Sequence, residues 1–501
     1  MKRHIIKLLF LVPFLLTVSA CKDPQAELYS YVTYDDLQKS TDPDVLTVLR
    51  KGAYSALYGT WGAHNSLWSM HEIASDELVI TQKGADWQDG GQWIRMHQHG
   101  MLPTEESVNN GWTYAYTAIA KLNLLISQFG GLESFAAELR ITRSLVYLWL
   151  IDAYGNVPYI TETDTDAQPA NITRAELFDK IEADVLASYD AVQDGPTYAS
   201  SNKDVANAIL AKLYLNAEVY TGKARWADAA ARCDSIISSG HYSLASNFLS
   251  NFVTDNASST ENIFVIPYDA VSAQGFNMAC MTLHYASQAT YDLQDQPWNG
   301  YATQEEFYNS FENGDARLGS FLVGPQYAAD GTTRLTDPNA EATDPDGPPL
   351  TYTPEINELY PNSLRQAGAR VGKWEFAMGA AQSLSNDYPI FRYADILLMR
   401  AEALWRQSSG SAEALDLVNQ VRTRAGVAAL TGLDADALLA ERGRELFAEG
   451  YRRSDLIRFG KFNQAWWEKD ASDPSKKLFP LPLTQLQANP NLTQNPGYPS
   501  L

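Results

Sequence analysis

Apolar residues at helical spacing recur along this chain and constrain its fold more than any other feature of the sequence. Between Ala206 and Tyr220 they recur in steps of three and four, and a second stripe runs from Trp226 to Ile237. Such stripes are typical of amphipathic helices that bury one face. Gly240 then stands where a left-handed helix cap belongs. The short connection between the stripes predicts an antiparallel hairpin of about the size of a tetratricopeptide repeat, ~34 residues.

The same pattern appears again near the C-terminus and in the first half of the chain. Apolar stripes flank a break at Ser408–Gly410, and they extend over residues 394–405 and 414–421. Further helices are expected over 46–58, 107–129, 133–153 and 174–193. The sequence therefore predicts a mainly α fold, a tetratricopeptide-like solenoid of helical hairpins.

Residues 241–389 differ from the rest of the chain. They contain 10 of the 23 prolines, together with many Gly, Asn and Asp residues, but they also contain many aromatic residues. A disordered segment would be poor in aromatic residues. This segment is therefore expected to be an ordered, loop-rich, irregular subdomain that supplies much of a binding surface. The predicted organisation is one domain over 46–501, with helical hairpins at 46–240 and 390–450, the loop-rich insertion 241–389 and an extended C-terminal tail 451–501.

The N-terminus has the features of an export signal. A positively charged start precedes the apolar run Leu8–Leu16, which is too short to span a bilayer. The small residues before Cys21 resemble the bacterial lipobox, in which the cysteine is lipidated and becomes the mature N-terminus. Residues 1–20 are therefore predicted to be a lipoprotein signal peptide and 21–45 a lipid-attached tether. Ordinary cleavage near Ala20 is the alternative.

Charge and cysteine content limit the classes of partner. The chain has 38 basic and 60 acidic residues and a net charge of −22, so nucleic acid and anionic membrane surfaces are not expected partners. Three cysteines are too few for a disulfide scaffold. Cys233 and Cys280 can form one bridge or remain two buried thiols.

Five blocks of sequence occur in a recognisable order behind the lipobox: Gly155–Tyr159, Pro389–Ala403, Val421–Gly426, Arg442–Arg453 and Asn489–Tyr498. In this order they resemble the SusD/RagB family of outer-membrane lipoproteins of Bacteroidetes. The resemblance implies tetratricopeptide-type helices beside a loop-rich subdomain. It also implies attachment to the cell outer membrane, facing the exterior, as a nutrient-binding lid over a SusC-like TonB-dependent β-barrel transporter.

Charged residues within these blocks have a structural interpretation. Arg444, Glu445 and Glu449 are spaced for ion pairs within and between helices. Arg392 and Asp395 can fix the start of a helix over 391–407. These residues are expected to maintain the fold and are not placed in a binding site.

Tryptophan and tyrosine in two non-helical segments predict a carbohydrate site. Sugar rings stack their C–H faces on aromatic rings, and their hydroxyls need polar groups at the ring edge. One segment extends from Trp61 past Trp68 to residue 93, and the other covers 291–301. Exposure is expected for three of the tryptophans, at 87, 93 and 298, whereas Trp61 and Trp68 can equally belong to the core. The predicted ligand-binding residues are Trp87, Trp93, Tyr291, Asp292, Trp298, Asn299 and Tyr301.

Other candidate chemistry is weaker. His97 and His99 would share one side of a strand, but no third metal ligand follows at a specific spacing, so polar loop histidines are expected. No cofactor is expected, and Ca²⁺ binding is left open. The acidic pairs Glu105–Glu106, Asp292/Asp295 and Glu305–Glu306 are expected to be solvated, and no catalytic motif is present.

The sequence thus predicts a cell-surface lipoprotein without catalytic activity. It would capture an oligo- or polysaccharide and deliver it to a β-barrel importer. Three alternatives remain: a peptide ligand for the same importer role, a glycoside hydrolase, and a structural partner of the barrel that binds no soluble ligand.

Overall fold

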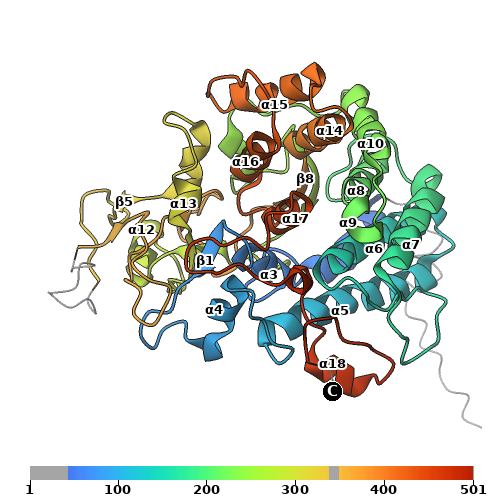
Figure 1. The fold of residues 1–501 in the computed structure, drawn as a ribbon, viewed down its shortest axis with the longest axis horizontal. Coiled ribbons are helices and arrows are strands. Elements are labelled where there is room, and N and C mark those ends of the chain that lie inside the picture. Colours follow the sequence, from blue (N-terminus) through green and yellow to red (C-terminus); the bar gives the residue numbers. More distant parts are fainter. Residues whose placement is uncertain (1–42, 338–348, 500–501) are drawn as a thin grey trace, which may run out of the picture.

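The computed structural model describes residues 43–337 and 349–499 (Figure 1). The predicted signal peptide, the lipidation site Cys21 and all but the end of the tether 21–45 lie outside the described residues. Within those residues, no helix combines the length and the apolar character that crossing a membrane requires.

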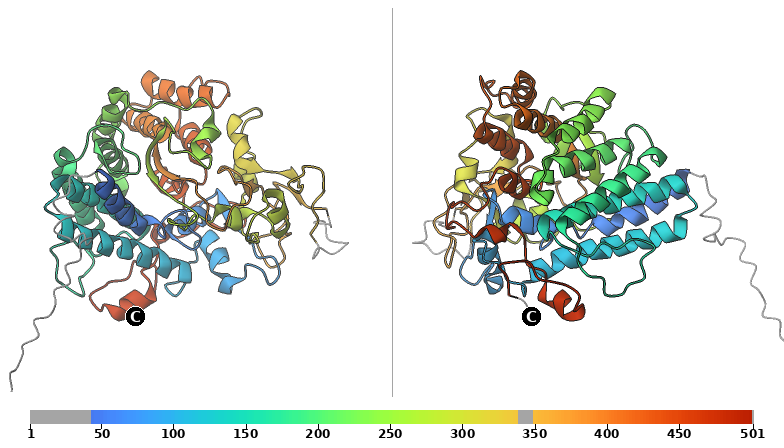
Figure 2. Two further views of the ribbon diagram at one scale, coloured as in Figure 1. Left: turned by 180° about the vertical axis from the view of Figure 1, so that it is seen from behind. Right: turned by 45° about the vertical axis from the view of Figure 1, so that its right-hand side comes forward.

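The long helices form one array, in which each packs against the next one along the chain (Figure 2). The predicted mainly α, tetratricopeptide-like fold is confirmed, because the apolar stripes of the sequence are the faces that these helices bury against one another. The helices of the array are α5 (Glu106–Phe129), α6 (Glu133–Ala153), α7 (Arg174–Ser188), α8 (Lys203–Leu215), α10 (Trp226–Ser239), α14 (Tyr393–Gln407) and α15 (Ala412–Arg424).

Local sequence determines where several of these helices begin and end. Thr173 accepts a hydrogen bond from the backbone N–H of Glu176, whose side chain reaches back to Thr173, and this capping box starts α7. Gly240 ends α10 in the left-handed conformation (φ 68°), as its position in the sequence predicts.

The array continues across the insertion. Helix α10 packs directly against α14, although more than 150 residues separate them in sequence. Strand β2 (Asn262–Ile266) pairs antiparallel with β8 (Tyr388–Arg392), which leads straight into α14. The two groups of hairpins predicted at 46–240 and 390–450 are therefore parts of one continuous layer of helices.

Between β2 and β8 the chain forms only short elements, as its proline and glycine content predicts. They gather at the end of the molecule opposite α6 and α7 (Figures 1 and 2). Two-stranded antiparallel sheets join β1 (Leu78–Ile80) to β3, β4 to β7 and β5 to β6. The elements are α11 (Met278–Thr282), α12 (Gln288–Tyr291), β3 (Tyr301–Thr303), α13 (Glu305–Tyr308), β4 (Phe321–Leu322), β5 (Gly324–Pro325), β6 (Thr351–Tyr352) and β7 (Arg370–Val371).

The remaining elements surround the array and include the C-terminal segment. This segment, expected to be extended over 451–501, contains two short helices, so that expectation is wrong for these turns. The elements are α2 (Pro43–Tyr54), α3 (Leu67–Ile73), β1 (Leu78–Ile80), α4 (Gln92–His97), α9 (Ala217–Thr221), α16 (Ala435–Leu446), α17 (Arg452–Arg458) and α18 (Leu483–Ala488).

Large aromatic side chains fill the main core. Trp61 stacks on Trp149 with ring centroids 4.7 Å apart, and the indole N–H of Trp68 donates to the carbonyl oxygen of Ala448 at 3.1 Å. Trp61 and Trp68 are thus core residues. Cys233 and Cys280 are both buried free thiols, so the bridge that the sequence left open does not form.

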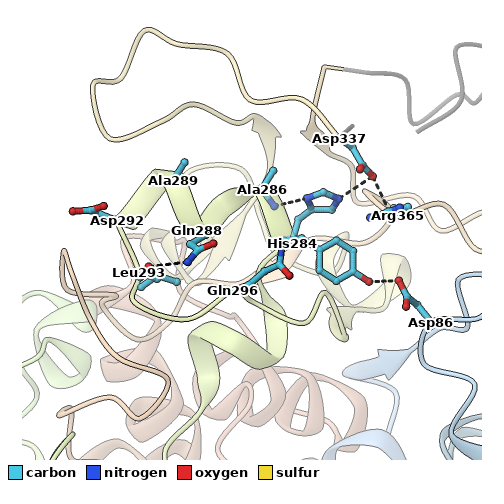
Figure 3. Close-up of a pocket in the computed structure, with 11 residues that line it drawn as sticks. Asp86, His284, Ala286, Gln288, Ala289, Asp292, Leu293, Gln296, Asp337 and Arg365 are labelled. Atoms are coloured by element: carbon cyan, nitrogen blue, oxygen red, sulfur yellow. Dashed lines mark hydrogen bonds and ion pairs between the residues drawn. The ribbon is translucent and has the colours of Figure 1, made fainter. Parts of the chain in front are cut away.

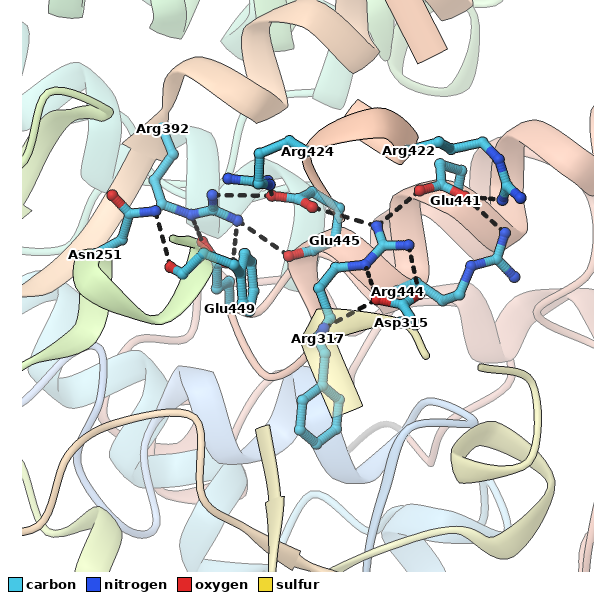
Figure 4. A network of polar contacts seen from close by, with 12 residues as sticks. Asn251, Asp315, Arg317, Arg392, Arg422, Arg424, Glu441, Arg444, Glu445 and Glu449 are labelled. Carbon is cyan, nitrogen blue, oxygen red and sulfur yellow. Dashed lines mark hydrogen bonds and ion pairs between the residues drawn. The ribbon is translucent and has the colours of Figure 1, made fainter. Parts of the chain in front are cut away.

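A network of buried ion pairs joins the insertion to the C-terminal helices (Figure 4). Arg317 pairs with Asp315, with Glu441 at 2.7 Å and with Glu445 at 3.3 Å. Arg392, directly before α14, pairs with Glu445 at 3.1 Å and with Glu449 at 2.6 Å. These side chains are almost completely buried. The structural role predicted for the charged motif residues is confirmed.

Glu445 is the centre of this network, to which we refer below as the ionic network. It accepts hydrogen bonds from Arg317, Arg392 and Arg424. Although burial alone would raise the pKa of the Glu445 carboxyl, these guanidinium groups lower it to about 2. Each buried charge is therefore compensated by several partners.

Candidate functional site

The candidate site is an open cleft of about 660 Å³ at the end of the molecule formed by the insertion (Figure 3). Most of its lining comes from the turn that follows α11, from α12 and from the loop directly after α12. A loop after β1 and two later loop positions complete it. The lining residues are Asp86, His284, Tyr285, Ala286, Gln288, Ala289, Asp292, Leu293, Gln296, Asp337 and Arg365.

A histidine and a carboxylate form one wall of this cleft. Nδ1 of His284 accepts a hydrogen bond from the backbone N–H of Ala286 at 3.1 Å, which places the ring proton on Nε2. Nε2 then donates to Oδ2 of Asp337 at 3.1 Å. Burial lowers the pKa of His284, against the opposing effect of Asp337, so this imidazole is neutral at pH 7. Both ring nitrogens are occupied, and neither is free to accept a proton from a ligand.

Tyr285 presents the aromatic ring of the cleft. Its hydroxyl donates to Oδ2 of Asp86 at 2.5 Å, and the guanidinium of Arg365 lies over the ring, 4.8 Å from its centroid. Burial and Asp86 raise the pKa of Tyr285, so the phenol remains protonated. The ring is only partly buried. Tyr285 therefore offers a fixed, partly accessible face with polar groups at its edges.

The structure brings together the two segments that the sequence selected. The indole N–H of Trp87 donates to the carbonyl oxygen of Trp298 at 2.6 Å. A Cβ at Gly300 would lie 2.2 Å from the Trp87 ring, so only glycine allows this approach. Asp86 and Asp292, one from each segment, both line the cleft.

The predicted aromatic residues lie mainly beneath the cleft. Trp93 and Tyr301 are buried, with 1% and 0% of their surface exposed, and Trp87 and Trp298 are partly buried. The expected exposure of Trp93 is wrong, because its indole N–H donates to Asp89 and its ring packs against His64. The rings of Trp87, Trp93, Trp298 and Tyr301 surround His64, and burial lowers the pKa of that histidine to about 4.

The other predicted residues position the cleft walls. Asn299 is fully buried and donates from Nδ2 to the carbonyl oxygen of Arg365 at 2.8 Å. Tyr291 packs edge-on against Phe376. Asp292 ends α12 in the left-handed conformation (φ 51°) and is exposed. Of the predicted set, Asp292 is thus the side chain that lines the cleft.

Sequence reasoning missed Tyr285, His284, Asp337 and Arg365. His284 and Tyr285 follow a short helix without a recognisable motif, and Asp337 and Arg365 meet them only through the folding of separate loops. Tyr285 belongs to the aromatic residues that made 241–389 an expected binding surface. That enrichment was the one signal that could have indicated it.

His97 and His99 have structural partners. His97 and His99 lie at and just after the end of α4, not in a strand. A ring nitrogen of His97 contacts the carbonyl oxygen of Trp467 at 2.8 Å, and His99 contacts Ser472 and the carbonyl oxygen of Ala74. Across residues 43–337 and 349–499, no group of three or more His, Cys, Asp or Glu side chains is placed to hold a metal ion.

A second cavity, of about 810 Å³, lies beside α2. Tyr58, Tyr198 and Asp387 line it, and the Tyr198 hydroxyl donates to Oδ2 of Asp387 at 2.7 Å. Burial raises the pKa of Asp387 to about 6. Neither predicted segment contributes to this cavity, so the cleft remains the candidate site.

Fold and cleft together define a class: a tetratricopeptide-like helical protein whose candidate ligand site lies in an irregular insertion. Two family models match the chain. One, described as "SusD family", matches residues 371–498, and the other, described as "Starch-binding associating with outer membrane", matches residues 37–215. The chain is thus similar to the SusD family in its C-terminal part and to a starch-binding, outer-membrane-associated family in its N-terminal part. The cleft residues from 284 to 365 lie between the two matched ranges.

Similar proteins cover almost the whole chain. The starch-binding protein SusD of Bacteroides thetaiotaomicron is 24% identical over 500 residues, which cover 88% of this chain and 86% of that protein. The structure of a SusD superfamily protein from Parabacteroides distasonis has a TM-score of 0.74 at 22% identity and covers 92% of this chain and 100% of its own. Surface glycan-binding protein A from Bacteroides thetaiotaomicron in complex with laminarihexaose has a TM-score of 0.68 at 22% identity, with 90% and 99% covered.

Proposed function

We propose that this protein binds glycan chains at the cell surface through the cleft between Asp86, Tyr285 and Asp292. The observation that carries the proposal is the partly accessible Tyr285 ring, held between Asp86 and Arg365. An aromatic face with carboxylates at its edges matches the flat C–H face and the outward hydroxyls of a sugar. The relatives named above as starch-binding and glycan-binding support this ligand class.

The wider role follows from the family. We propose that Cys21 bears the lipid, that the protein stays on the outer membrane facing the exterior, and that it delivers its glycan to a SusC-like TonB-dependent transporter. Binding without catalysis is part of the proposal. Both nitrogens of His284 are engaged, Asp337 is held by His284 and Arg365, and the relatives are named for binding.

Native affinity electrophoresis tests the ligand class directly. The purified protein migrates through gels that contain starch, laminarin or other polysaccharides, and retardation by at least one of them is expected. Tyr285→Ala should weaken it strongly, since truncation of an aromatic residue at the centre of a binding site costs about 2 kcal/mol or more. The matched control is Tyr327→Ala, which removes an exposed tyrosine that does not line the cleft.

Each outcome separates the alternatives. Unretarded migration through every gel, with binding to a peptide mixture in calorimetry, would replace the glycan by a peptide ligand. Release of reducing sugar, abolished by changing an acid in 291–306, would make the protein a hydrolase. Copurification of a β-barrel transporter from detergent-solubilised outer membranes is the expected result for the delivery role. Its absence would remove that part of the proposal.

A further inference from the structure

The charges around the cleft are unevenly distributed. Three carboxylates line it, those of Asp86, Asp292 and Asp337, against one guanidinium, that of Arg365. His284 adds no charge at pH 7, because burial lowers its pKa. Among the lining residues that the structure describes, Arg365 is the single cation, so the cleft has an excess of negative charge.

The one cation is already engaged. Nε of Arg365 pairs with Oδ2 of Asp337 at 2.8 Å, and its guanidinium covers the Tyr285 ring. Recognition of a carboxylate or sulfate by arginine needs the planar fork of N–H donors to face the ligand. Here Nε is paired with Asp337 and the guanidinium lies over the Tyr285 ring, so Arg365 is oriented by the wall of the cleft and not as a receptor for an anionic sugar.

The carboxylate of Asp292, in contrast, faces the space that a ligand would fill, and Asp86 is exposed at the other side of the cleft, where one of its oxygens accepts from Tyr285. Asp292 is exposed, and its carboxylate makes no hydrogen bond or ion pair with any residue in 43–337 or 349–499. Figure 3 shows it at the rim, on the side of the cleft away from Asp86. An ionised carboxylate only accepts hydrogen bonds, so these groups match the hydroxyl hydrogens of a sugar and repel its acidic substituents.

We infer that the cleft selects uncharged glycans and rejects chains whose sugars carry carboxylate or sulfate groups. This inference rests on the proposed function and specifies its substrate class. Like charges several ångströms apart in a partly shielded cleft should weaken binding of an acidic chain about tenfold or more at low salt. Because screening shortens the range of this repulsion, the difference should shrink as salt is added.

The whole chain is also acidic, with a net charge of −22, and would repel any polyanion from a distance. A test must therefore separate the effect of the charges in the cleft from the effect of the net charge of the chain. Asp292→Asn removes one charge at the rim, and asparagine also tolerates the left-handed backbone of this position. Asp86→Asn removes a second charge. The control is Asp190→Asn with Asp416→Asn, two exposed acids outside the cleft lining, which gives the same change of net charge.

The experiment compares each neutral polysaccharide with its own derivative, in which C6 hydroxyls are oxidised to carboxylates. Starch, laminarin and the other neutral chains of the gel panel are tested as such pairs, together with alginate and pectin. The expected result is retention by a neutral chain and about tenfold weaker retention by its oxidised form. The D86N/D292N variant should reduce this ratio at least threefold, and the D190N/D416N control should leave it unchanged.

The outcomes are distinguishable. Equal retention by a neutral chain and its oxidised form, or strongest retention by alginate or pectin, would overturn the charge selectivity and leave the glycan-binding proposal standing. A ratio that falls equally in the control variant would assign the effect to the net charge and overturn the role of the cleft. Failure of every polysaccharide to retard the protein would overturn the proposed function, and the selectivity with it.

Discussion

The ionic network and the cleft use the same residue types with opposite results. Glu445 is fully buried, and three arginines donate to it. Asp292 is exposed and unpaired within the described residues. In the network every carboxylate is paired with cations of the same chain, so its charge contributes to the stability of the fold. In the cleft acidic groups remain turned toward solvent, where a ligand can reach them.

The two regions also differ in how they match the family models. Glu445 and Glu449 belong to the block Arg442–Arg453, which lies within the matched residues 371–498. The cleft residues between 284 and 365 match neither family model. The matched sequence pattern therefore identifies the part of this protein that stabilises the fold, and says little about the cleft that we propose as the ligand site.

The largest expected effect is from breaking the network at Arg392. Arg392→Met leaves Glu445 and Glu449 buried with fewer partners, which should cost about 3–5 kcal/mol of unfolding free energy. Urea denaturation measures the loss. Asp292→Met is the matched control in the cleft and should change stability by less than about 1 kcal/mol. A loss below about 1 kcal/mol for Arg392→Met would mean that the network is not needed for stability.

The second-largest effect is expected from low pH, which protonates Glu445 and so lowers the stability of the fold. The pKa of Glu445 is about 2 in the folded protein, against 4.5 for an ordinary glutamate. Its contribution to stability is therefore complete above pH 4.5 and is lost as the pH falls toward 2, by about 3 kcal/mol in total. Denaturant unfolding at pH 7, 4 and 3 measures this loss.

Other carboxyl groups titrate over the same pH range, so the comparison needs a variant. In Glu445→Gln the stability should fall less steeply between pH 4.5 and 3 than in the unchanged protein. Parallel pH profiles for the two proteins would contradict the assignment to Glu445.

The contact between the two cleft segments can be disturbed at Gly300. An alanine there would place its Cβ 2.2 Å from the Trp87 ring, so Gly300→Ala should cost about 1–3 kcal/mol and weaken glycan retention severalfold. Gly432→Ala is the control, because no atom lies within 4 Å of its added Cβ. Thermal unfolding and the affinity gels provide the readouts, and unchanged values in both would show that Trp87 moves freely.

The smallest expected effect concerns the stability of the cleft rim. Asp292→Asn should change the free energy of unfolding by no more than about 0.5 kcal/mol, because the exposed carboxylate has no partner to lose. Thermal unfolding at pH 7 measures this. A larger loss would show that Asp292 helps to maintain the fold and would remove the contrast with Glu445.

Much of the fold could be predicted from the sequence because helices are determined locally. The apolar stripe from Trp226 to Ile237 and the cap at Gly240 specify α10 without reference to the rest of the chain. Its packing against α14 could not be predicted in this way, because that contact bridges more than 150 residues.

The site could be predicted only in part, for the same reason. Aromatic residues indicated two regions that meet in the structure, although the first region is not free of helix as expected: Trp68 lies in α3 and Trp93 in α4. Whether a given ring faces solvent depends on neighbours from other loops, however: Trp93 is covered by His64, whereas Tyr285 is held open by Asp86 and Arg365. The amino-acid composition of a segment does not specify which residues of other loops will cover its aromatic rings.

The pairing of β2 with β8 places the start and the end of the insertion side by side. Closing a loop between two adjacent points depends only weakly on its length. Away from Asp315 and Arg317, which belong to the ionic network, the loops between these strands can thus gain, lose or replace residues while the helical array keeps its contacts. A change of specificity in these loops therefore requires no redesign of the helices that support them.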